Sequence, residues 1–219
     1  MGGDTVTEFS PAAKAQLGTW DTRFEDEYAA WLAALPPPAL PANRAAEAVA
    51  MDASTFIAMT LACAPLVRTN TARALVSVES AFNPWAIGVV GGALVRQPQH
   101  RTEALATAKA LQAAGWNFSV GLGQINVGNF TRLGLTLDSA FEPCTNLAAM
   151  QTVLAECFER ASVQATTPLM HQAALQKALS CYYSGNFTTG FRHGYVRKVV
   201  AAAGTPARSI PTISPKEKA

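Results

Sequence analysis

A run of three prolines at residues 36–38, followed by Pro41, constrains the fold of this chain more than any other feature. Proline fixes its own φ and lacks the N–H that a helix needs, so a helix must end before this run. Upstream, apolar side chains recur at helical spacing across residues 20–35, with acidic side chains on the opposite face. The apolar face contains Trp20, Phe24, Tyr28, Trp31, Leu32 and Leu35. Residues 1–50 are therefore predicted to be an N-terminal extension with an isolated amphipathic acidic helix and a proline-rich linker. The aromatic face of that helix is expected to pack on the folded body or on a neighbouring molecule.

From Met51 the sequence becomes an alanine-rich series of apolar segments, which predicts a helical body over residues 51–203. Helices are expected at residues 52–63, 71–81, 102–114, 146–162 and 169–183, with Asn70 and Asn146 as caps near two of the starts. β-Prone runs at 86–90 and 93–95 flank Gly91-Gly92 and predict a small β-hairpin. The predicted fold class is therefore mainly α (α+β).

The two ends of the chain and its apolar stretches carry further predictions. Residues 204–219 contain three prolines and few apolar side chains, so they are predicted to be a disordered tail. The uncharged stretch from Ala53 to Val67 has 15 residues, fewer than the roughly 20 of a transmembrane helix, so no transmembrane segment is expected. The sequence after Met1 is polar and does not resemble a signal peptide. Either export depends on a segment absent from this sequence, or the protein is not exported.

The distribution of charged residues along the sequence indicates which class of partner the protein can bind. Residues 1–50 contain seven acidic and three basic side chains, whereas residues 51–219 contain eight acidic and fourteen basic ones. A moderately basic body favours an anionic polymer as partner. No arginine-rich or aromatic–basic motif accompanies this charge, so no nucleic-acid partner is predicted.

Four cysteines stand at positions 63, 144, 157 and 181, without a C-x-x-C pair. None of the three histidines lies at ligand spacing from them, so no metal site is expected, and no cofactor is implied either. In a reducing compartment the four would be buried thiols. In an exported protein they would form two disulfides, and the spacing alone leaves three pairings open.

Glu79 is the acidic residue most suited to catalysis. It follows the apolar run Ala74–Val78 near the end of a predicted helix, whereas most other acids of the body lie in polar surroundings. Desolvation and the negative end of the helix dipole should both raise the pKa of its carboxyl group. Such a carboxyl can hold a proton near neutral pH and act as a general acid.

Two further segments contain side chains that suit a sugar ligand. Residues 119–126 combine two glycines with the polar side chains of Ser119, Gln124 and Asn126. Glycine allows a close approach of the backbone to a ligand, and amide groups match sugar hydroxyl and N-acetyl groups. Residues 180–187 end a predicted helix with Gly185 at the C-cap and contain Tyr182 and Tyr183. Each segment taken alone is also compatible with an ordinary turn.

Taken together, three motifs occur in the order found in lytic transglycosylases with a goose-type lysozyme fold. They read Glu79-Ser80-x-x-Asn83-Pro84, Gly121-Leu122-x-Gln124-Ile125-Asn126 and Tyr182-x-x-Gly185. The chain resembles this family over about residues 55–202, and it looks most similar to the peptidoglycan-cleaving subunits of type IV secretion systems. The segments 63–65, 83–92 and 180–183 carry that closer similarity. The third motif departs from the usual Ala-Tyr-Asn-Ala-Gly, because Cys181, Tyr183 and Ser184 fill its first, third and fourth places.

The resemblance implies a lysozyme-like domain at residues 51–203 and a role for each matched residue. Glu79 would be the catalytic acid/base. Ser80 and Ser119 would support the sugar or the carboxylate by hydrogen bonds, Gln124 and Asn126 would line the saccharide cleft, and Tyr182 would face Glu79 across it. The implied reaction cleaves the β-1,4 bond between MurNAc and GlcNAc and leaves a 1,6-anhydro-MurNAc end. A single carboxylate suffices for this route, because the C6 hydroxyl of the sugar is the nucleophile.

The implied partners are peptidoglycan glycan strands and other type IV secretion subunits, and the implied location is the periplasm. In that compartment two disulfides are expected, and the favoured pairs are Cys144–Cys157 and Cys63–Cys181. Two alternatives stay open. A hydrolytic lysozyme would need Asp138 or Glu142 to hold a water molecule, and a scaffold that binds peptidoglycan or secretion subunits would need no turnover at all.

Overall fold

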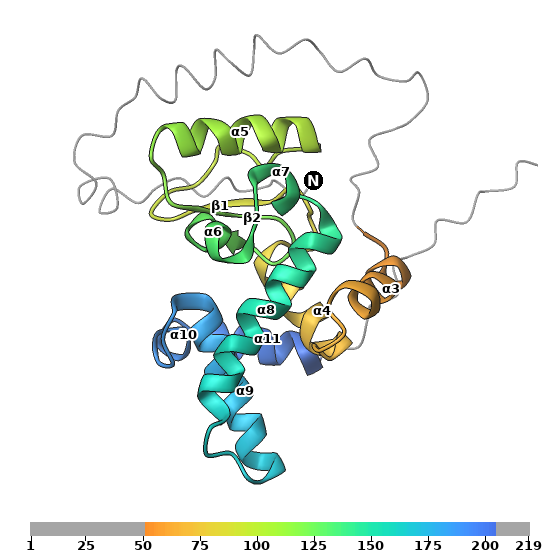
Figure 1. The fold of residues 1–219 in the computed structure, drawn as a ribbon, viewed down its shortest axis with the longest axis vertical. Coiled ribbons are helices and arrows are strands. Elements are labelled where there is room, and N and C mark those ends of the chain that lie inside the picture. The colour runs from red at the N-terminus through yellow and green to blue at the C-terminus, as the bar shows by residue number, and fades with distance from the viewer. Residues whose placement is uncertain (1–50, 205–219) are drawn as a thin grey trace, which may run out of the picture.

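A computed structural model describes residues 51–204 (Figure 1). The predicted helix at residues 20–35, the proline-rich linker and the residues beyond 204 lie outside the described part. Within residues 51–204, no helix is both long and apolar enough to cross a membrane.

The described chain is mainly helical and contains one small sheet. The longer helices are α3 (Ala53–Cys63), α4 (Thr69–Glu79), α5 (Arg101–Ala113), α8 (Pro143–Ser162), α9 (Pro168–Ser184) and α11 (Tyr195–Gly204). The shorter ones are η1 (Val127–Asn129), α6 (Phe130–Leu133), α7 (Leu137–Ala140) and α10 (Thr189–Arg192). The strands are β1 (Ile87–Val89), β2 (Phe118–Val120) and β3 (Ile125–Asn126), in an antiparallel sheet of order β1-β2-β3. The mainly α (α+β) fold class predicted from the sequence is confirmed.

The five predicted helices are all present, but the two predicted caps are wrong. Asn70 lies inside the first turn of α4, and the N-cap position belongs to Arg68. Helix α8 begins three residues earlier than expected, at Pro143, because proline at the first helical position is already set to a helical φ. Asn146 therefore lies one turn inside α8, where its side chain is buried. Helix α11 is an element that the sequence analysis did not identify.

The predicted hairpin around Gly91-Gly92 is also wrong. Strand β1 pairs with β2, in the register Ile87↔Val120 and Val89↔Phe118, and α5 lies between the two strands in sequence. The side chain of Gln97 accepts a hydrogen bond from the Ile87 N–H at 2.8 Å and donates one to the Ile87 carbonyl at 2.9 Å. One amide side chain thus occupies the edge of β1 that the expected strand at residues 93–95 would have paired with.

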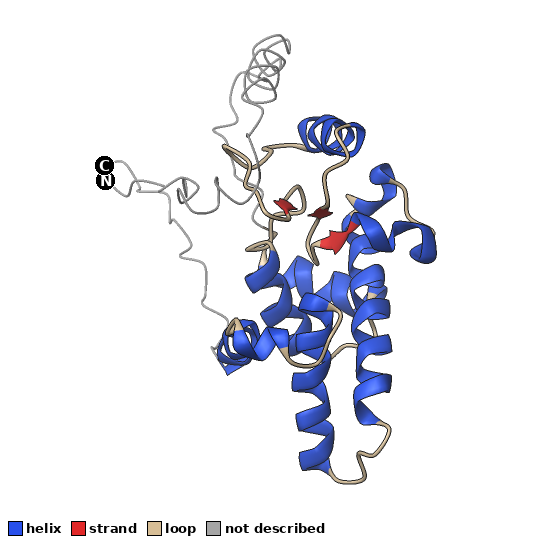
Figure 2. Ribbon diagram, turned by 90° about the vertical axis from the view of Figure 1, so that its left-hand side faces the viewer, coloured by secondary structure: helices blue, strands red, loops and turns tan. Residues whose placement is uncertain are grey.

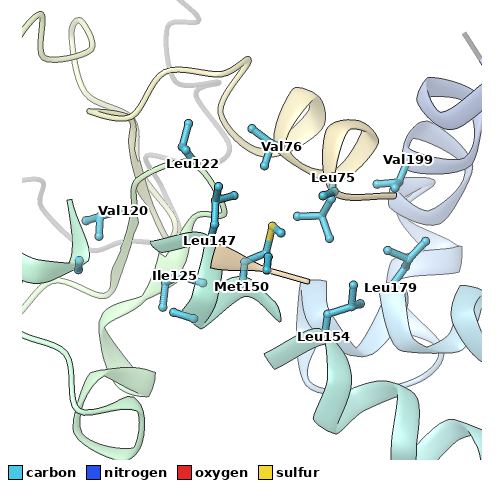
Figure 3. Close-up of a cluster of buried hydrophobic side chains, with 14 of the residues drawn as sticks. Leu75, Val76, Val120, Leu122, Ile125, Leu147, Met150, Leu154, Leu179 and Val199 are labelled. Atoms are coloured by element: carbon cyan, nitrogen blue, oxygen red, sulfur yellow. The ribbon is translucent and has the colours of Figure 1, made fainter. Parts of the chain in front are cut away.

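The sheet and α5 lie at one end of the molecule, and the paired helices α8 and α9 extend to the other (Figures 1 and 2). Helix α4 lies between these two parts and packs mainly on α11. Figure 3 shows Leu75 and Val76 of α4 among buried side chains from both parts, including Leu122, Met150 and Val199. Burial of this face fixes the position of α4, and hence of the carboxyl group at its last residue.

Two disulfides form, as predicted, but in a different pairing. The bonds join Cys63 to Cys144 and Cys157 to Cys181, with Cα–Cα distances of 5.3 and 5.8 Å. The predicted Cys144–Cys157 bond is impossible because both residues lie on α8, where 13 residues of helix span about 20 Å. Each cysteine of α8 instead bonds to the helix beside it, α3 at the first turn and α9 in the second half.

Candidate active site

Glu79 is the last residue of α4, and the chain turns sharply after it. Ala81 and Phe82 both have positive φ values, of 50° and 64°, which non-glycine residues rarely adopt. The ring of Phe82 packs edge-on against Phe56 of α3, at 5.2 Å between centroids, and this contact helps to hold the unusual backbone. The Asn83 side chain accepts a hydrogen bond from the Trp85 N–H at 2.9 Å. The first motif therefore ends α4 at the carboxyl group and directs the chain into β1.

The carboxyl group of Glu79 is half-buried at the end of α4, and it accepts a hydrogen bond from the Tyr195 hydroxyl at its Oε1 atom. Desolvation raises the pKa of Glu79 to about 7, although the hydrogen bond from Tyr195 acts in the opposite direction. Burial, together with the nearby Glu79 charge, raises the pKa of both Tyr182 and Tyr195 above the ordinary tyrosine value. Both phenols therefore stay protonated while the carboxyl group of Glu79 titrates near neutral pH.

Tyr182 lies on α9 and connects that helix to the second motif. Its hydroxyl donates to the Gly123 carbonyl at 2.5 Å, and its pKa responds to the charge of Glu79. A Cβ atom at Gly123 would lie 2.9 Å from the Met150 Cβ and 3.0 Å from the Tyr182 hydroxyl oxygen. Glycine at position 123 is thus required by the close packing of this loop on α8 and α9.

The amide side chains of the second motif bind mainly to the loop and sheet around them. Gln124, with a φ of 49°, donates to the Ala86 and Gly121 carbonyls at 3.1 and 2.9 Å. Asn126 donates to Asn117 Oδ1 at 2.7 Å and to Ser119 Oγ at 3.3 Å, and Ser119 is its partner across the β2–β3 pair. These bonds connect the turn between β2 and β3 to the end of the sheet.

Tyr182 lies close enough to Glu79 for its pKa to respond to that charge, and it binds the loop at residues 121–124 through the Gly123 carbonyl. Ser80, by contrast, donates its hydroxyl to the Val76 carbonyl at 3.2 Å, and the whole residue is buried at the end of α4. Ser119 and Asn126 bind to each other at the β2–β3 pair, and Gln124 binds to two backbone carbonyls. The hydrogen bonds that the structure gives to Ser80, Ser119, Gln124 and Asn126 are thus made within the protein.

Sequence reasoning missed two residues of this region, Tyr195 and Asn146. Tyr195 is the first residue of α11, and the buried spacing of Tyr195, Val196 and Val199 was the signal that could have identified this helix. Asn146 lies four residues before Met150 and eight before Leu154, on the buried stripe of α8. Its position in that stripe, rather than at a cap, could have identified it as a core polar residue.

Asn146 holds the second motif in place through three hydrogen bonds. Its Oδ1 accepts from the Gly123 N–H at 2.7 Å, and its Nδ2 donates to the Val120 and Ala140 carbonyls at 3.0 and 2.7 Å. The residue is only 1% exposed, so water cannot replace these bonds. The amide of Asn146 thus positions the loop to which Tyr182 donates its hydroxyl hydrogen bond.

We expect Asn146→Ala to lower the free energy of unfolding by about 2–3 kcal/mol, because buried donors and acceptors lose their partner. Urea denaturation measures this change. Thr152→Ala is the matched control, since Thr152 is exposed on the same helix and its hydroxyl binds only the Ala148 carbonyl among the contacts described. Equal stabilities of the two variants would contradict the role assigned to Asn146.

Comparison with known proteins identifies one family model and several similar proteins. Residues 57–200 match the family described as "Transglycosylase SLT domain". The type IV secretion system protein virB1 of Brucella suis biovar 1 is 47% identical over 163 residues, covering 72% of this chain and 68% of that protein. The Brucella abortus biovar 1 protein of the same name is 48% identical over 160 residues, covering 71% and 66%. Protein virB1 of Rhizobium radiobacter is 37% identical over 156 residues, covering 71% and 64%.

These matches cover about two thirds of the length of each relative. No solved structure matches the chain. The family match spans all three motifs, from before Glu79 to beyond Tyr182, and it includes Tyr195. By this match and by the identity to the virB1 proteins, the chain belongs to the transglycosylase SLT domain family.

Proposed function

We propose that this chain is a peptidoglycan lytic transglycosylase in which Glu79 is the acid/base. The observation that carries the proposal is the half-buried carboxyl group of Glu79, which accepts a hydrogen bond from Tyr195 and whose pKa desolvation raises to about 7. A carboxyl group with that pKa can donate a proton at neutral pH and then accept one as a carboxylate. One residue can therefore serve both steps of the reaction.

In the first step, protonated Glu79 donates its proton to the glycosidic oxygen between MurNAc and GlcNAc. The bond from C1 of MurNAc to that oxygen breaks, and the GlcNAc side leaves as an alcohol. In the second step, the carboxylate of Glu79 accepts the proton of the C6 hydroxyl group while the C6 oxygen bonds to C1. The product is a 1,6-anhydro-MurNAc end, no water is consumed, and Glu79 is again protonated. The sugar supplies its own nucleophile, and proximity replaces a second catalytic group.

The surroundings of Asp138 and Glu142 favour this route over hydrolysis. Both carboxylates bind the Arg101 guanidinium, at 2.8 and 3.0 Å, and their side chains are 70% and 52% exposed. Two effects shift the pKa of Glu79: desolvation of its carboxyl group and the hydrogen bond from Tyr195. No carboxylate of residues 51–204 contributes to the shift. An inverting hydrolase would need a second carboxylate on the opposite side of the sugar to activate water. Neither of these two residues supports that role.

The proposed setting is the periplasm, where the enzyme would open peptidoglycan for a type IV secretion apparatus. Relatives named type IV secretion system proteins support this setting, and so do the two disulfides, which form and persist in an oxidising compartment. The partners would be glycan strands and other secretion subunits. A scaffold without turnover is the alternative, and the raised pKa of Glu79 favours the enzyme.

Mass spectrometry of the fragments released from purified sacculi tests the reaction. We expect muropeptides that end in 1,6-anhydro-MurNAc. Fragments with a reducing MurNAc end would support the hydrolase instead, and intact sacculi would support the scaffold.

The pH dependence of activity provides a separate test. Because Glu79 must be protonated to act first as an acid, we expect kcat/KM to decrease as pH rises through about 7. Initial rates of glycan cleavage between pH 5 and 9 measure this decrease, which is the high-pH limb of the profile. A limb near pH 4.5, the ordinary pKa of a glutamate side chain, would contradict the buried and protonated state assigned to Glu79.

A further inference from the structure

The aromatic side chain that donates a hydrogen bond to Glu79, Tyr195, is packed against two others, Tyr183 and His193. The ring of Tyr183 on α9 stacks on the ring of Tyr195, with centroids 4.6 Å apart and an interplanar angle of 21°. The ring of His193 meets Tyr183 edge-on at 5.9 Å and 80°. The Tyr183 hydroxyl lies 3.3 Å from His193 Nδ1, within hydrogen-bonding distance. His193, Tyr183 and Tyr195 therefore form a continuous series of contacts that ends at the carboxyl group of Glu79.

The orientation of the Tyr195 ring determines where its hydroxyl meets Glu79, so the contact with Tyr183 can affect the carboxyl group. It is the first residue of α11 and follows Gly194, whose φ of 73° marks a turn. Tyr195 is 5% exposed, and its hydroxyl donates to Glu79 Oε1. A phenol can rotate about its two side-chain torsions, and a ring stacked on its face restricts that rotation. The stack on Tyr183 thus limits where the Tyr195 hydroxyl can lie.

Tyr183 itself is 45% exposed, so folding gains little from burying its ring. It also occupies the place where the third motif of the wider family usually has asparagine, which has no ring to stack. An exposed aromatic residue whose described contacts are with Tyr195 and His193 suggests a role in positioning these groups rather than in the core.

We propose that Tyr183 is a positioning residue for the reaction: its ring, held by His193, orients Tyr195 so that the Tyr195 hydroxyl directs the carboxyl group of Glu79. The inference rests on the proposed function of Glu79 as the acid/base. It predicts that Tyr183 affects turnover only through the hydroxyl group of Tyr195.

Single substitutions test the stack. Tyr183→Asn, which removes the ring, should lower kcat on sacculi about tenfold with little change in KM, because a misplaced catalytic group slows the chemical step. Tyr183→Phe keeps the stack on Tyr195 and the edge-on ring contact with His193, and it loses only the contact of the hydroxyl with His193 Nδ1, so it should retain most of the activity. Phe191→Asn is the matched control, because Phe191 is similarly exposed (44%) on the neighbouring helix α10, and it should turn over at the parent rate.

The pH dependence of kcat/KM provides a second measurement, which should not change if Tyr183 only stabilises the fold. The hydrogen bond from Tyr195 lowers the pKa of Glu79, so loosening that bond should let the pKa rise. The high-pH limb of kcat/KM should therefore shift to higher pH in Tyr183→Asn and in Tyr195→Phe. It should stay in place in Phe191→Asn.

A double-mutant cycle identifies the route of the effect. Tyr195→Phe keeps the stacked ring but removes the hydroxyl, so Tyr183→Asn should change kcat little further in that background. Full additivity of the two substitutions would overturn the proposal, because Tyr183 would then act independently of the Tyr195 hydroxyl. A rise in KM with unchanged kcat and pH profile would also overturn it and would indicate a direct sugar contact.

Glu79→Gln in the same assay separates this inference from the function on which it rests. If Glu79→Gln is inactive and Tyr183→Asn behaves like the parent, the acid/base assignment holds and the positioning role is wrong. If Glu79→Gln retains the parent rate, the acid/base assignment itself is wrong, and the positioning role is wrong with it. Equal melting temperatures of the parent and Tyr183→Asn would show that any loss of kcat is not a loss of fold.

Discussion

Glu79→Gln is expected to reduce peptidoglycan cleavage by roughly 10²–10⁴-fold or more, the range typical for loss of a general acid or base. Glutamine has nearly the same shape, and its side-chain oxygen can still accept a hydrogen bond from Tyr195, so folding and saccharide binding should persist. The rate of release of anhydro-muropeptides measures the effect. Glu159→Gln is the control, because Glu159 is an exposed acid on α8 and should leave the rate unchanged. Parent-level activity in Glu79→Gln would remove Glu79 from the mechanism.

The same substitution should increase stability, with a characteristic pH dependence. The pKa of Glu79 is about 7 in the folded protein against an ordinary value of 4.5, so the folded state holds this proton more tightly than the unfolded state. Stability of the parent should therefore fall as pH rises from 4.5 to 7, and above 7 the full cost of burying the carboxylate applies. Glu79→Gln avoids that cost, which is about 3 kcal/mol. Thermal unfolding should show the variant to be more stable at pH 8 and equal to the parent at pH 4.

Removal of the Cys63–Cys144 disulfide by the double substitution Cys63→Ser and Cys144→Ser should lower the free energy of unfolding by about 4 kcal/mol. The bond closes a loop of 81 residues, from the end of α3 to the start of α8, and a long loop constrains the unfolded chain strongly. Urea denaturation of the oxidised proteins measures the change.

The other disulfide supplies the matched comparison. The Cys157–Cys181 bond closes only 24 residues, so the double substitution Cys157→Ser and Cys181→Ser should cost less, about 3 kcal/mol. A larger loss for this shorter loop would show that packing between α8 and α9, rather than loop closure, dominates the contribution. Two reactive thiols per molecule in either doubly substituted protein would contradict the pairing seen in the structure.

The sequence by itself determined the helical class of the fold, the positions of five helices and the candidate acid. These are local properties. Helical periodicity, a glycine at the end of α9 and an acid after an apolar run are each visible within a few turns of the chain. Gly185 was expected at a C-cap and has the left-handed φ of 76° that such a cap requires. The order of the three motifs indicated the lytic transglycosylase family, and the match of residues 57–200 to the transglycosylase SLT domain confirmed it.

Only the tertiary structure decided how these elements meet. The partner of β1 lies about 30 residues away in sequence, beyond α5, whereas a local pattern favours the nearer β-prone run at residues 93–95. The disulfide pairing depended on which helices lie beside each end of α8, which spacing along the chain does not contain. Asn146 and Tyr195 act on Gly123 and Glu79, residues 23 and 116 positions away. Contacts of this kind arise when buried faces of separate helices pack, and a local pattern in one helix does not specify the partner on another.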